Sequence, residues 1–264
     1  MHKSTMNMNK ISQTFQIISD MHIEAGDPKS FTVIKQIEAR TPTLVIAGDM
    51  GSFHRIQPMI QLLEEAADKF KHVLYVPGNH EYYHDSNANR KCKSLGELLY
   101  AFKRAVSEKP RLQNVHVLDR KMVNIDGVTF AGATLWSDVG NAKALPEYIR
   151  LDVSVEEYQA MHRRDIKWLY RVSKMKTDGP LVVITHHAPS KTLLLPSRFA
   201  RKYSSFYATN LENTSIFKKA DVWVFGHTHH NVDVNIGSTR VVANQFGKKN
   251  DACNADFKKI IAIN

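Results

Sequence analysis

Residues Thr43 to Asp49 read TLVIAGD, a run of apolar residues that ends in Gly-Asp. Residues Thr14 to Asp20, TFQIISD, have the same form. A nearly continuous apolar run of this length is typical of a strand that is covered on both faces of its sheet. Each stretch therefore predicts a buried β-strand with a carboxylate at its carboxyl end.

Further runs of this kind follow along the chain, and helical patterns lie between them. The additional predicted strands are His72 to Asn79 (HVLYVPGN), Pro180 to His187 (PLVVITHH) and Asp221 to His227 (DVWVFGH). Apolar residues that share one helical face are Ile56, Met59, Ile60, Leu63, Ala67 and Phe70. The segments Leu95 to Val106 and Val155 to Val172 have similar patterns. Alternating strands and helices of this kind predict an α/β fold that begins with βαβ units.

The later part of the chain favours antiparallel strands. Asn124 to Gly132 holds an Asp-Gly turn between apolar alternations, which predicts a hairpin. A second hairpin is expected over Val232 to Asn244 and a last strand over Phe257 to Asn264. We find no repeat and no linker, so residues 1–264 are predicted to form a single domain.

Composition narrows the class of protein. Of the 264 residues 43% are hydrophobic and 23% are charged, which is ordinary for a globular protein. No stretch approaches the length of a membrane helix, and the polar start of the chain does not resemble a secretory signal. Cys92 and Cys253 form no disulfide framework, so a cytoplasmic location without membrane contact is expected. The formal net charge of +10 favours anionic partners such as nucleotides or nucleic acid.

The five predicted strands end in residues that bind metals or transfer protons. Their ends read SDMH, AGDMG, PGNHE, THHAP and GHTHH, and they hold seven of the 13 histidines. Ligands bind beyond the carboxyl ends of strands in α/β sheets, so these groups are expected to meet at one edge. Imidazole and carboxylate suit Mn, Fe or Zn, and a carboxylate can bridge two ions. The pattern predicts a dinuclear metal site.

These blocks resemble those of the calcineurin-like metallophosphoesterase superfamily. The family has D-x-H, GD, GNH followed by an acid, His, and GH-x-H, and all five stand here in order from Asp20 to His229. The resemblance implies an α/β/β/α fold, in which two mixed β-sheets pack as a sandwich with helices outside. It also implies two divalent metal ions at one edge, with Mn²⁺ expected first and Fe or Zn²⁺ as alternatives.

The resemblance also implies a role for each matching residue. One ion would be held by Asp20, His22, Asp49 and His229, and the other by Asp49, Asn79, His186 and His227. His186 is preferred to His187 because it lies nearer the strand. His80 would contact the phosphate and protonate the leaving oxygen. The expected substrate contacts are Asn79, His80, Tyr82 and His187.

The function expected from this resemblance is metal-dependent hydrolysis of a phosphodiester, a pyrophosphate or a nucleotide-like substrate. Two divalent ions outweigh two carboxylates, so the site should attract phosphate, and metal-bound hydroxide would attack in line. One alternative is a nuclease on short or single-stranded nucleic acid. Another is a non-catalytic metal-binding scaffold with the same fold. The sequence names neither the substrate nor the oligomeric state.

The chain departs from two branches of the family. Protein Ser/Thr phosphatases continue GD with an Asp that orients the catalytic His, but here that position is Ser52. His80 is therefore left without an orienting partner in the sequence. A bacterial branch with similar sequence motifs usually has Asn-Pro-Arg-Gly-Tyr as its last motif. In this chain the corresponding residues, Asn244 to Lys249, read NQFGKK. The segment Arg198 to Tyr207 could be a lid, a base-stacking segment or a plain surface loop.

Overall fold

The computed structural model describes residues 13–84, 93–140, 150–195, 203–249, 251 and 253–263. Cys92, Asn264 and residues 198–202 of the segment discussed above lie outside these ranges. In the described part of the chain, the apolar helix length needed to cross a membrane is not reached.

Two mixed β-sheets form the centre of the protein. The first has the strand order β11-β1-β2-β3-β4, and the second has the order β5-β6-β7-β8-β10-β9. The first sheet consists of β1 (Gln13–Ile18), β2 (Thr43–Ala47), β3 (His72–Val76), β4 (Val115–Val117) and β11 (Ile260–Ile263). The second consists of β5 (Lys121–Ile125), β6 (Val128–Ala133), β7 (Leu181–Thr185), β8 (Val222–Phe225), β9 (Asp233–Ile236) and β10 (Thr239–Ala243).

Parallel pairing in both sheets brings the carboxyl ends of the central strands together. The pairs β1–β2, β2–β3 and β3–β4 are parallel in the first sheet, and β6–β7, β7–β8 and β8–β10 are parallel in the second. The pairs β1–β11, β5–β6 and β9–β10 are antiparallel. All five predicted buried strands are present, and the predicted fold of two mixed sheets is confirmed. The short strand β4 was not predicted.

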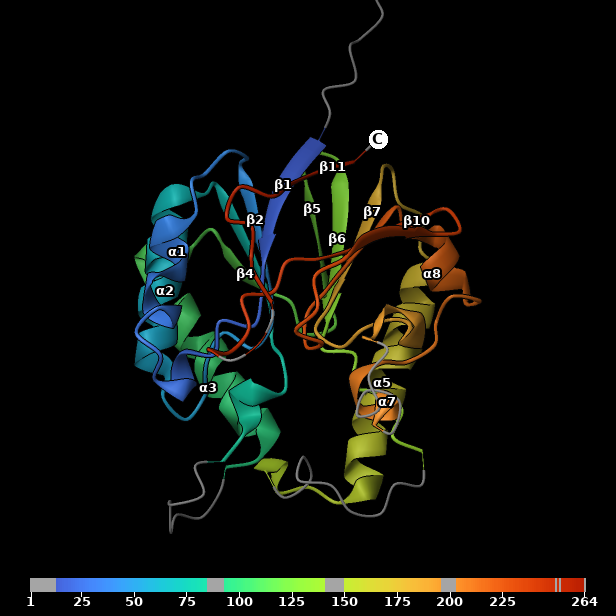
Figure 1. The fold of residues 1–264 in the computed structure, drawn as a ribbon, viewed down its shortest axis with the longest axis horizontal. Coiled ribbons are helices and arrows are strands. Elements are labelled where there is room, and N and C mark those ends of the chain that lie inside the picture. Colours follow the sequence, from blue (N-terminus) through green and yellow to red (C-terminus); the bar gives the residue numbers. More distant parts are fainter. Residues whose placement is uncertain are drawn as a thin grey trace, which may run out of the picture.

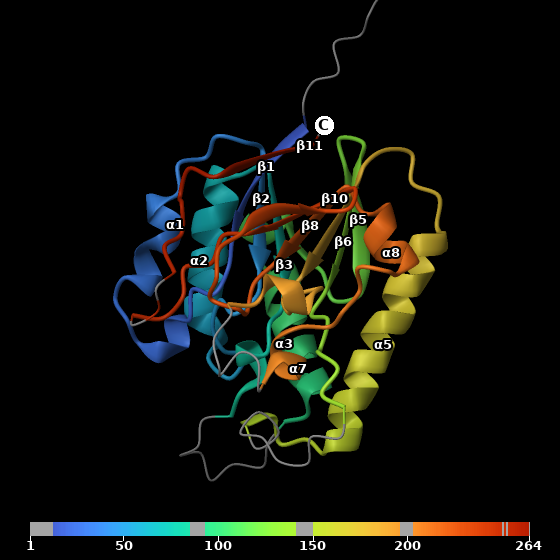
Figure 2. The same cartoon turned by 45° about the vertical axis from the view of Figure 1, so that its right-hand side comes forward.

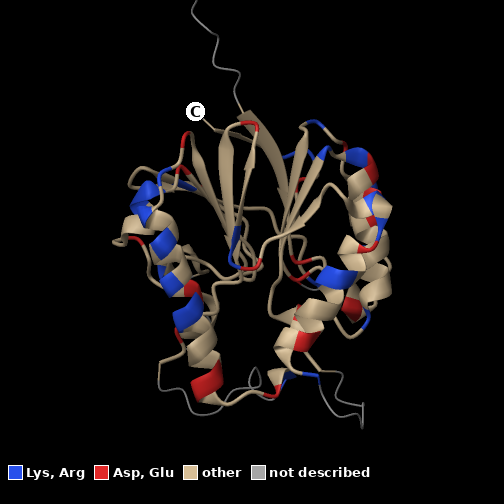
Figure 3. Cartoon of the chain, turned by 180° about the vertical axis from the view of Figure 1, so that it is seen from behind, with Lys and Arg blue, Asp and Glu red and all other residues tan. Residues whose placement is uncertain are grey.

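The sheets pack face to face between two layers of helices (Figures 1 and 2). Outside the first sheet lie α1 (Val33–Gln36), α2 (Ile56–Lys69) and α3 (Leu95–Ser107). Outside the second lie α5 (Val155–Lys174) and α8 (Ser215–Lys219), whereas α7 (Ser204–Tyr207) lies beyond the carboxyl ends of the strands (Figure 2). The 3-10 turns are η1 (Ile23–Ala25), η2 (Ser30–Thr32), η3 (His80–Tyr82), η4 (Pro110–Leu112) and η5 (Lys191–Leu193). Charged residues lie mainly on the helices and loops, whereas the strands are mostly uncharged (Figure 3).

Burial on both faces explains the continuous apolar runs. In β1, Phe15 and Ile17 point into the layer between the sheets, where Phe15 meets Phe130 of β6 edge-on at 5.6 Å between ring centroids. Ile18 of the same strand packs in the core beneath the helices. The alternating side chains of one strand thus enter two different cores, so no polar alternation remains for the sequence to show.

The predicted Asp-Gly hairpin and the predicted apolar helix face are present in the structure, which also shows a helix cap that was not predicted. Asp126 and Gly127 join β5 to β6 with φ values of 49° and 85°, as a type I′ hairpin requires. Ser94 caps α3, and its side chain forms a reciprocal capping box with Glu97. The predicted apolar face of α2 is buried at Met59, Ile60 and Leu63. Phe70 lies just beyond the helix but is also buried.

Close approach of the two sheets requires glycine at position 132. A Cβ atom added to Gly132 of β6 would lie 2.5 Å from Cβ of Leu118 and 2.8 Å from Cγ2 of Val76. Both partners are buried, so neither can move away. We expect Gly132→Ala to lower the free energy of unfolding by about 1–3 kcal/mol, as measured by urea denaturation.

The matched control is Gly96→Ala in α3, where an added Cβ would meet no atom within 4 Å. This variant should keep or raise the free energy of unfolding, by up to about 1 kcal/mol. Equal effects of the two substitutions would contradict the close packing described at Gly132.

Candidate metal centre

The loops that follow β1, β2, β7 and β8 are joined directly by hydrogen bonds. The Asp20 N–H donates to the Gly48 carbonyl (3.0 Å), which links the ends of β1 and β2. The Gly226 N–H donates to the His186 carbonyl (2.9 Å), which links the ends of β8 and β7. The His227 N–H donates to Oδ1 of Asp20 (2.9 Å) and connects the two sheets. The predicted convergence of the strand ends is therefore present in the structure.

The backbone at this edge takes a conformation that non-glycine residues rarely adopt. Five of the predicted ligands have positive φ angles, namely Asp20 (57°), His22 (48°), Asp49 (51°), His227 (68°) and His229 (48°). Each such residue costs about 1–3 kcal/mol and persists only where the surroundings enforce it. This concentration of strain at the strand ends is typical of a functional site.

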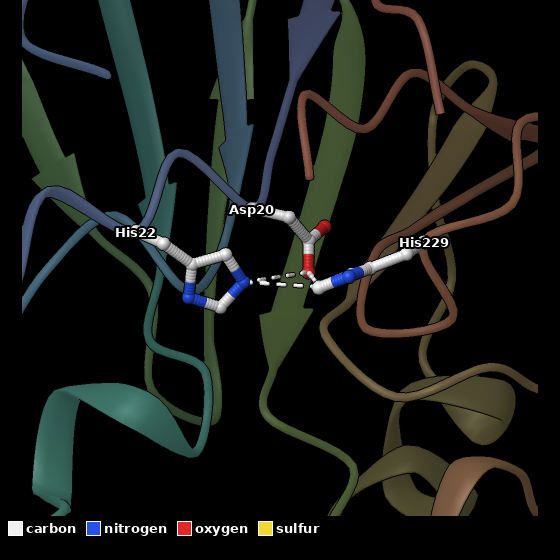
Figure 4. A group of neighbouring side chains, drawn as sticks. All are labelled: Asp20, His22 and His229. Carbon is white, nitrogen blue, oxygen red and sulfur yellow. Dashed lines mark hydrogen bonds and ion pairs between the residues drawn. The ribbon is translucent and has the colours of Figure 1, made fainter. Parts of the chain in front are cut away.

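The first group of ligand atoms belongs to Asp20, His22 and His229, and they lie within 4.8 Å of one another (Figure 4). Nε2 of His22 is 3.0 Å from Nε2 of His229, which is 3.4 Å from Oδ1 of Asp20. Nδ1 of His22 faces Glu24 and Nδ1 of His229 faces Asp251, so carboxylates accept a hydrogen bond from both rings. The two Nε2 atoms and the Asp20 carboxylate then need positive charge between them, which a divalent cation supplies.

The second group consists of Asp49, His186 and His227, whose ligand atoms also lie within 4.8 Å of one another. Nδ1 of His186 donates to the Ala47 carbonyl (2.9 Å). Nε2 of the same ring therefore faces Oδ1 of Asn79 at 2.9 Å and Oδ1 of Asp49 at 3.2 Å. This is the donor set of a metal site with one imidazole oriented by a backbone carbonyl.

Asp49 stands between the two groups. Its Oδ1 faces His186, and its Oδ2 lies 3.7 Å from Nε2 of His22. Asp49 is only 1% exposed, so both oxygens are directed into the site. One carboxylate with one oxygen toward each group has the geometry expected of a bridging ligand.

Burial and neighbouring charges set the protonation states of these ligands in the metal-free protein. Burial raises the pKa of Asp49, but the charges of His186 and His80 outweigh burial and hold that pKa well below its usual value. Burial lowers the pKa of His186, but the charge of Asp49 raises it to about 10. Burial, with the charges of His187 and His186, holds the pKa of His227 well below its usual value. The proton on His186 thus occupies the place of a cation, and metal binding would release it.

His80 has a partner that the sequence did not reveal. Nδ1 of His80 lies 2.8 Å from Oε1 of Glu24, a residue of the turn η1. Burial raises the pKa of Glu24, but hydrogen bonds and charge from His22 and His80 lower it to about 2, so Glu24 is ionised. Ser52 does not take this role, because its Oγ accepts a hydrogen bond from the N–H of His54. The only sequence signal for Glu24 is its position two residues after His22.

Glu81, the acidic residue of the GNHE block, connects the loops of the site through hydrogen bonds. It is fully buried and accepts hydrogen bonds from the N–H groups of Met50 (2.7 Å) and Gly78 (2.8 Å) and from the Tyr75 hydroxyl (2.8 Å). The Asp49 N–H also donates to Glu81, at 3.1 Å. Glu81 therefore fixes the loop that carries Asp49 against the loop that carries His80.

Two of the predicted substrate contacts are placed differently from the expectation. Tyr82 is 5% exposed and packs against Phe53 and Trp136 in the core, so it does not line the site. The side chain of the next residue, Tyr83, lies at the site instead. Its hydroxyl accepts a hydrogen bond from Nδ2 of Asn79 (2.6 Å), and its ring centroid is 4.4 Å from that of His80. A short turn decides which of two adjacent tyrosines faces the site.

His187 lies behind the second group of ligands. It is fully buried, and its ring centroid is 4.1 Å from that of His227. Burial and the charge of His186 lower the pKa of His187 to about 3, so the ring is neutral. This position suits packing against His227 better than the predicted contact with substrate.

A groove opens beside His22, and Lys248 reaches from it toward His80. The groove has a volume of about 470 Å³ and is lined by residues that include Gly26, Asp27, Lys248 and Lys249. The Gly247 N–H donates to the Asp20 carbonyl (3.0 Å), which fixes the loop. Nζ of Lys248 then lies 3.4 Å from Nε2 of His80. The sequence lacks the expected Arg in this loop, but a lysine brings a positive charge to the site.

Comparisons with known proteins identify the family and the fold. The chain is 25% identical to Uncharacterized protein L509 of Acanthamoeba polyphaga mimivirus, over 90% of this chain and 92% of that protein. The crystal structure of phosphopantetheinyl hydrolase (PptH) from Mycobacterium tuberculosis has a similar fold, with a TM-score of 0.65 and 19% identity, and covers 89% of this chain and 90% of that one. Residues 14–231 match the family model described as calcineurin-like phosphoesterase, and the chain therefore belongs to this family.

Proposed function

We propose that this protein is a metal-dependent phosphoesterase with a dinuclear centre. The observation that carries the proposal is the pair of adjacent ligand groups, Asp20–His22–His229 and Asp49–His186–His227, with Asp49 directed toward both. A cluster of side chains that only stabilises the fold seldom has so many buried imidazoles and ionised carboxylates on strained backbone. Such a cluster is typical of a cation site. Family membership supports the hydrolysis of phosphate esters.

The seven predicted ligands divide between two ions as the family resemblance implies. One ion would be held by Asp20, His22, Asp49 and His229, and the other by Asp49, Asn79, His186 and His227. Carboxylate and imidazole donors fit Mn²⁺, with Fe and Zn²⁺ as alternatives. When bound, the pair would activate a water molecule and draw negative charge from the phosphate.

His80 is proposed to supply the proton for the leaving oxygen. Burial lowers the pKa of His80, whereas an anionic phosphate next to Nε2 would favour the protonated ring. Nζ of Lys248 lies 3.4 Å from Nε2 of His80 and donates to it when the ring is neutral, whereas both nitrogens are donors once His80 is protonated. An anionic oxygen placed between these two groups would accept from both. We therefore assign Lys248 to substrate phosphate binding.

The substrate class that fits this site is a phosphodiester, a pyrophosphate or a nucleotide-like ester. The groove beside His22 offers space for the group that is esterified to the phosphate. The groove is lined by two lysines, Lys248 and Lys249, and by two aspartates, Asp27 and Asp251, so its charges balance, and Lys248 is the lysine that reaches His80.

Metal titration of the metal-free protein tests the assignment of ligands. We expect about two equivalents of Mn²⁺ per chain, as measured by isothermal titration calorimetry. His229→Ala should remove about one equivalent, because this residue serves a single ion, whereas Asp49→Asn should weaken both sites. Binding of only one equivalent by the wild type would contradict the dinuclear proposal.

Hydrolysis of bis(p-nitrophenyl) phosphate tests the activity. Metal-stripped protein should be inactive and should regain turnover with Mn²⁺. The turnover rate of Asp49→Asn should be lower by at least about 100-fold, because the substitution weakens the binding of both ions. Asp126→Asn is the matched control, since this residue lies exposed in the β5–β6 turn at a positive φ that Asn tolerates. A wild type that binds two ions and hydrolyses no phosphate ester would favour the metal-binding scaffold.

Substitution of Lys248 tests the phosphate contact. Lys248→Ala should raise KM about 10-fold or more, because a charge-assisted hydrogen bond to the phosphate is lost, while kcat changes by less than about 3-fold. Lys35→Ala, which removes an exposed lysine paired with Glu65, should leave both constants unchanged. An unchanged KM in Lys248→Ala would contradict the assignment of this residue to phosphate binding.

A further inference from the structure

Glu24 forms a third group of possible ligand atoms with His22 and His80, within 4.8 Å of one another, and the family motifs give it no role. Its Oε1 lies 2.8 Å from Nδ1 of His80 and 3.0 Å from Nδ1 of His22. Its other oxygen, Oε2, is buried and has no hydrogen-bond partner among the described residues. Among those residues, therefore, the Glu24 carboxylate is hydrogen-bonded to two imidazoles only.

The backbone places this carboxylate rigidly. Glu24 lies in η1, whose first residue, Ile23, donates its N–H to the Met50 carbonyl (3.1 Å). Gly26 closes the turn at a φ of 77° and donates its N–H to the Ile23 carbonyl. η1 is thus attached to the loop that carries Asp49. The side chain is 21% exposed, and its Oε1 is held by the two imidazoles.

His80 is fixed from the other side. Its N–H donates to Oδ1 of Asp49 (2.9 Å), and its side chain is 14% exposed. The His22 and His80 rings meet edge-on, with centroids 4.4 Å apart. With Nδ1 directed to Glu24, the only ring nitrogen of His80 left for a substrate is Nε2, which faces Lys248.

We propose that Glu24 is the positioning residue for His80, holding its Nδ1–H so that Nε2 faces the leaving oxygen of the substrate. His22 anchors the carboxylate, because its own Nδ1–H donates to the same oxygen while Nε2 is directed at the metal site. Glu24 thus takes the role that an Asp at position 52 would have in the protein phosphatase branch. This inference rests on the proposed function, in which His80 is the acid.

The kinetic test uses aryl phosphodiesters whose leaving groups differ in their need for a proton. At saturating Mn²⁺, Glu24→Ala should lower kcat about 10–100-fold for a phenol leaving group but less than about 3-fold for p-nitrophenol, which leaves without protonation. Glu24→Gln keeps an acceptor oxygen and should restore part of the loss. In a His80→Ala background, Glu24→Ala should lower kcat for the phenol ester by less than a further factor of about 3.

Three outcomes would overturn the assignment. The first is an equal loss for both leaving groups, and the second is a full further loss in the His80→Ala background. The third is recovery of Glu24→Ala as Mn²⁺ is raised, which would place the effect at His22 and the metal. Wild-type turnover of the p-nitrophenyl ester reports on the proposed function separately, so failure of one proposal is distinguishable from failure of the other.

A second readout does not depend on bound metal or on activity. In metal-free protein, the hydrogen-bonded Nδ1–H of His80 should give a downfield proton resonance that is missing in His80→Ala. We expect Glu24→Ala to abolish this resonance and Glu24→Gln to shift it. Glu108→Gln is the control, because this exposed residue pairs with Arg104 at the end of α3, away from the site. Persistence of the resonance in Glu24→Ala would contradict the proposal.

Discussion

The buried carboxylate of Asp49 imposes the constraint on which the rest of the site depends. A carboxylate that is 1% exposed must have its charge compensated within the protein. The compensation comes from His186 on one oxygen, His22 near the other, and the N–H of His80. The two groups of candidate metal ligands and the proposed acid are therefore organised around a single side chain.

This arrangement requires a scaffold that can hold strained loops. Five of the seven candidate ligands have positive φ angles, a conformation that persists only where the surroundings enforce it. Two sheets that pack face to face remove this freedom, because the Asp20, His186 and Gly226 backbones hydrogen-bond across strand ends. Glu81 adds a buried anchor beneath two of the loops.

The site divides its proposed tasks between two sets of residues. One set would hold the ions, which would supply the nucleophile and positive charge, and consists of Asp20, His22, Asp49, Asn79, His186, His227 and His229. His80, Glu24 and Lys248 form a separate row at the edge of these ligands, with contacts of 2.8 Å and 3.4 Å to the two nitrogens of His80. Proton transfer can therefore be altered without removing a metal ligand.

Local sequence was sufficient for the five central strands and for the convergence of the seven candidate ligands. Each strand is apolar because both of its faces are buried, and in parallel sheets the residue after each strand reaches the same edge. Glu24, Lys248 and the exchange of Tyr82 for Tyr83 required the tertiary structure. Glu24 and His80 are 56 residues apart, and short turns set the direction of their side chains. Periodicity records which face of a strand is buried, but contacts between loops of different strands depend on how those loops are packed.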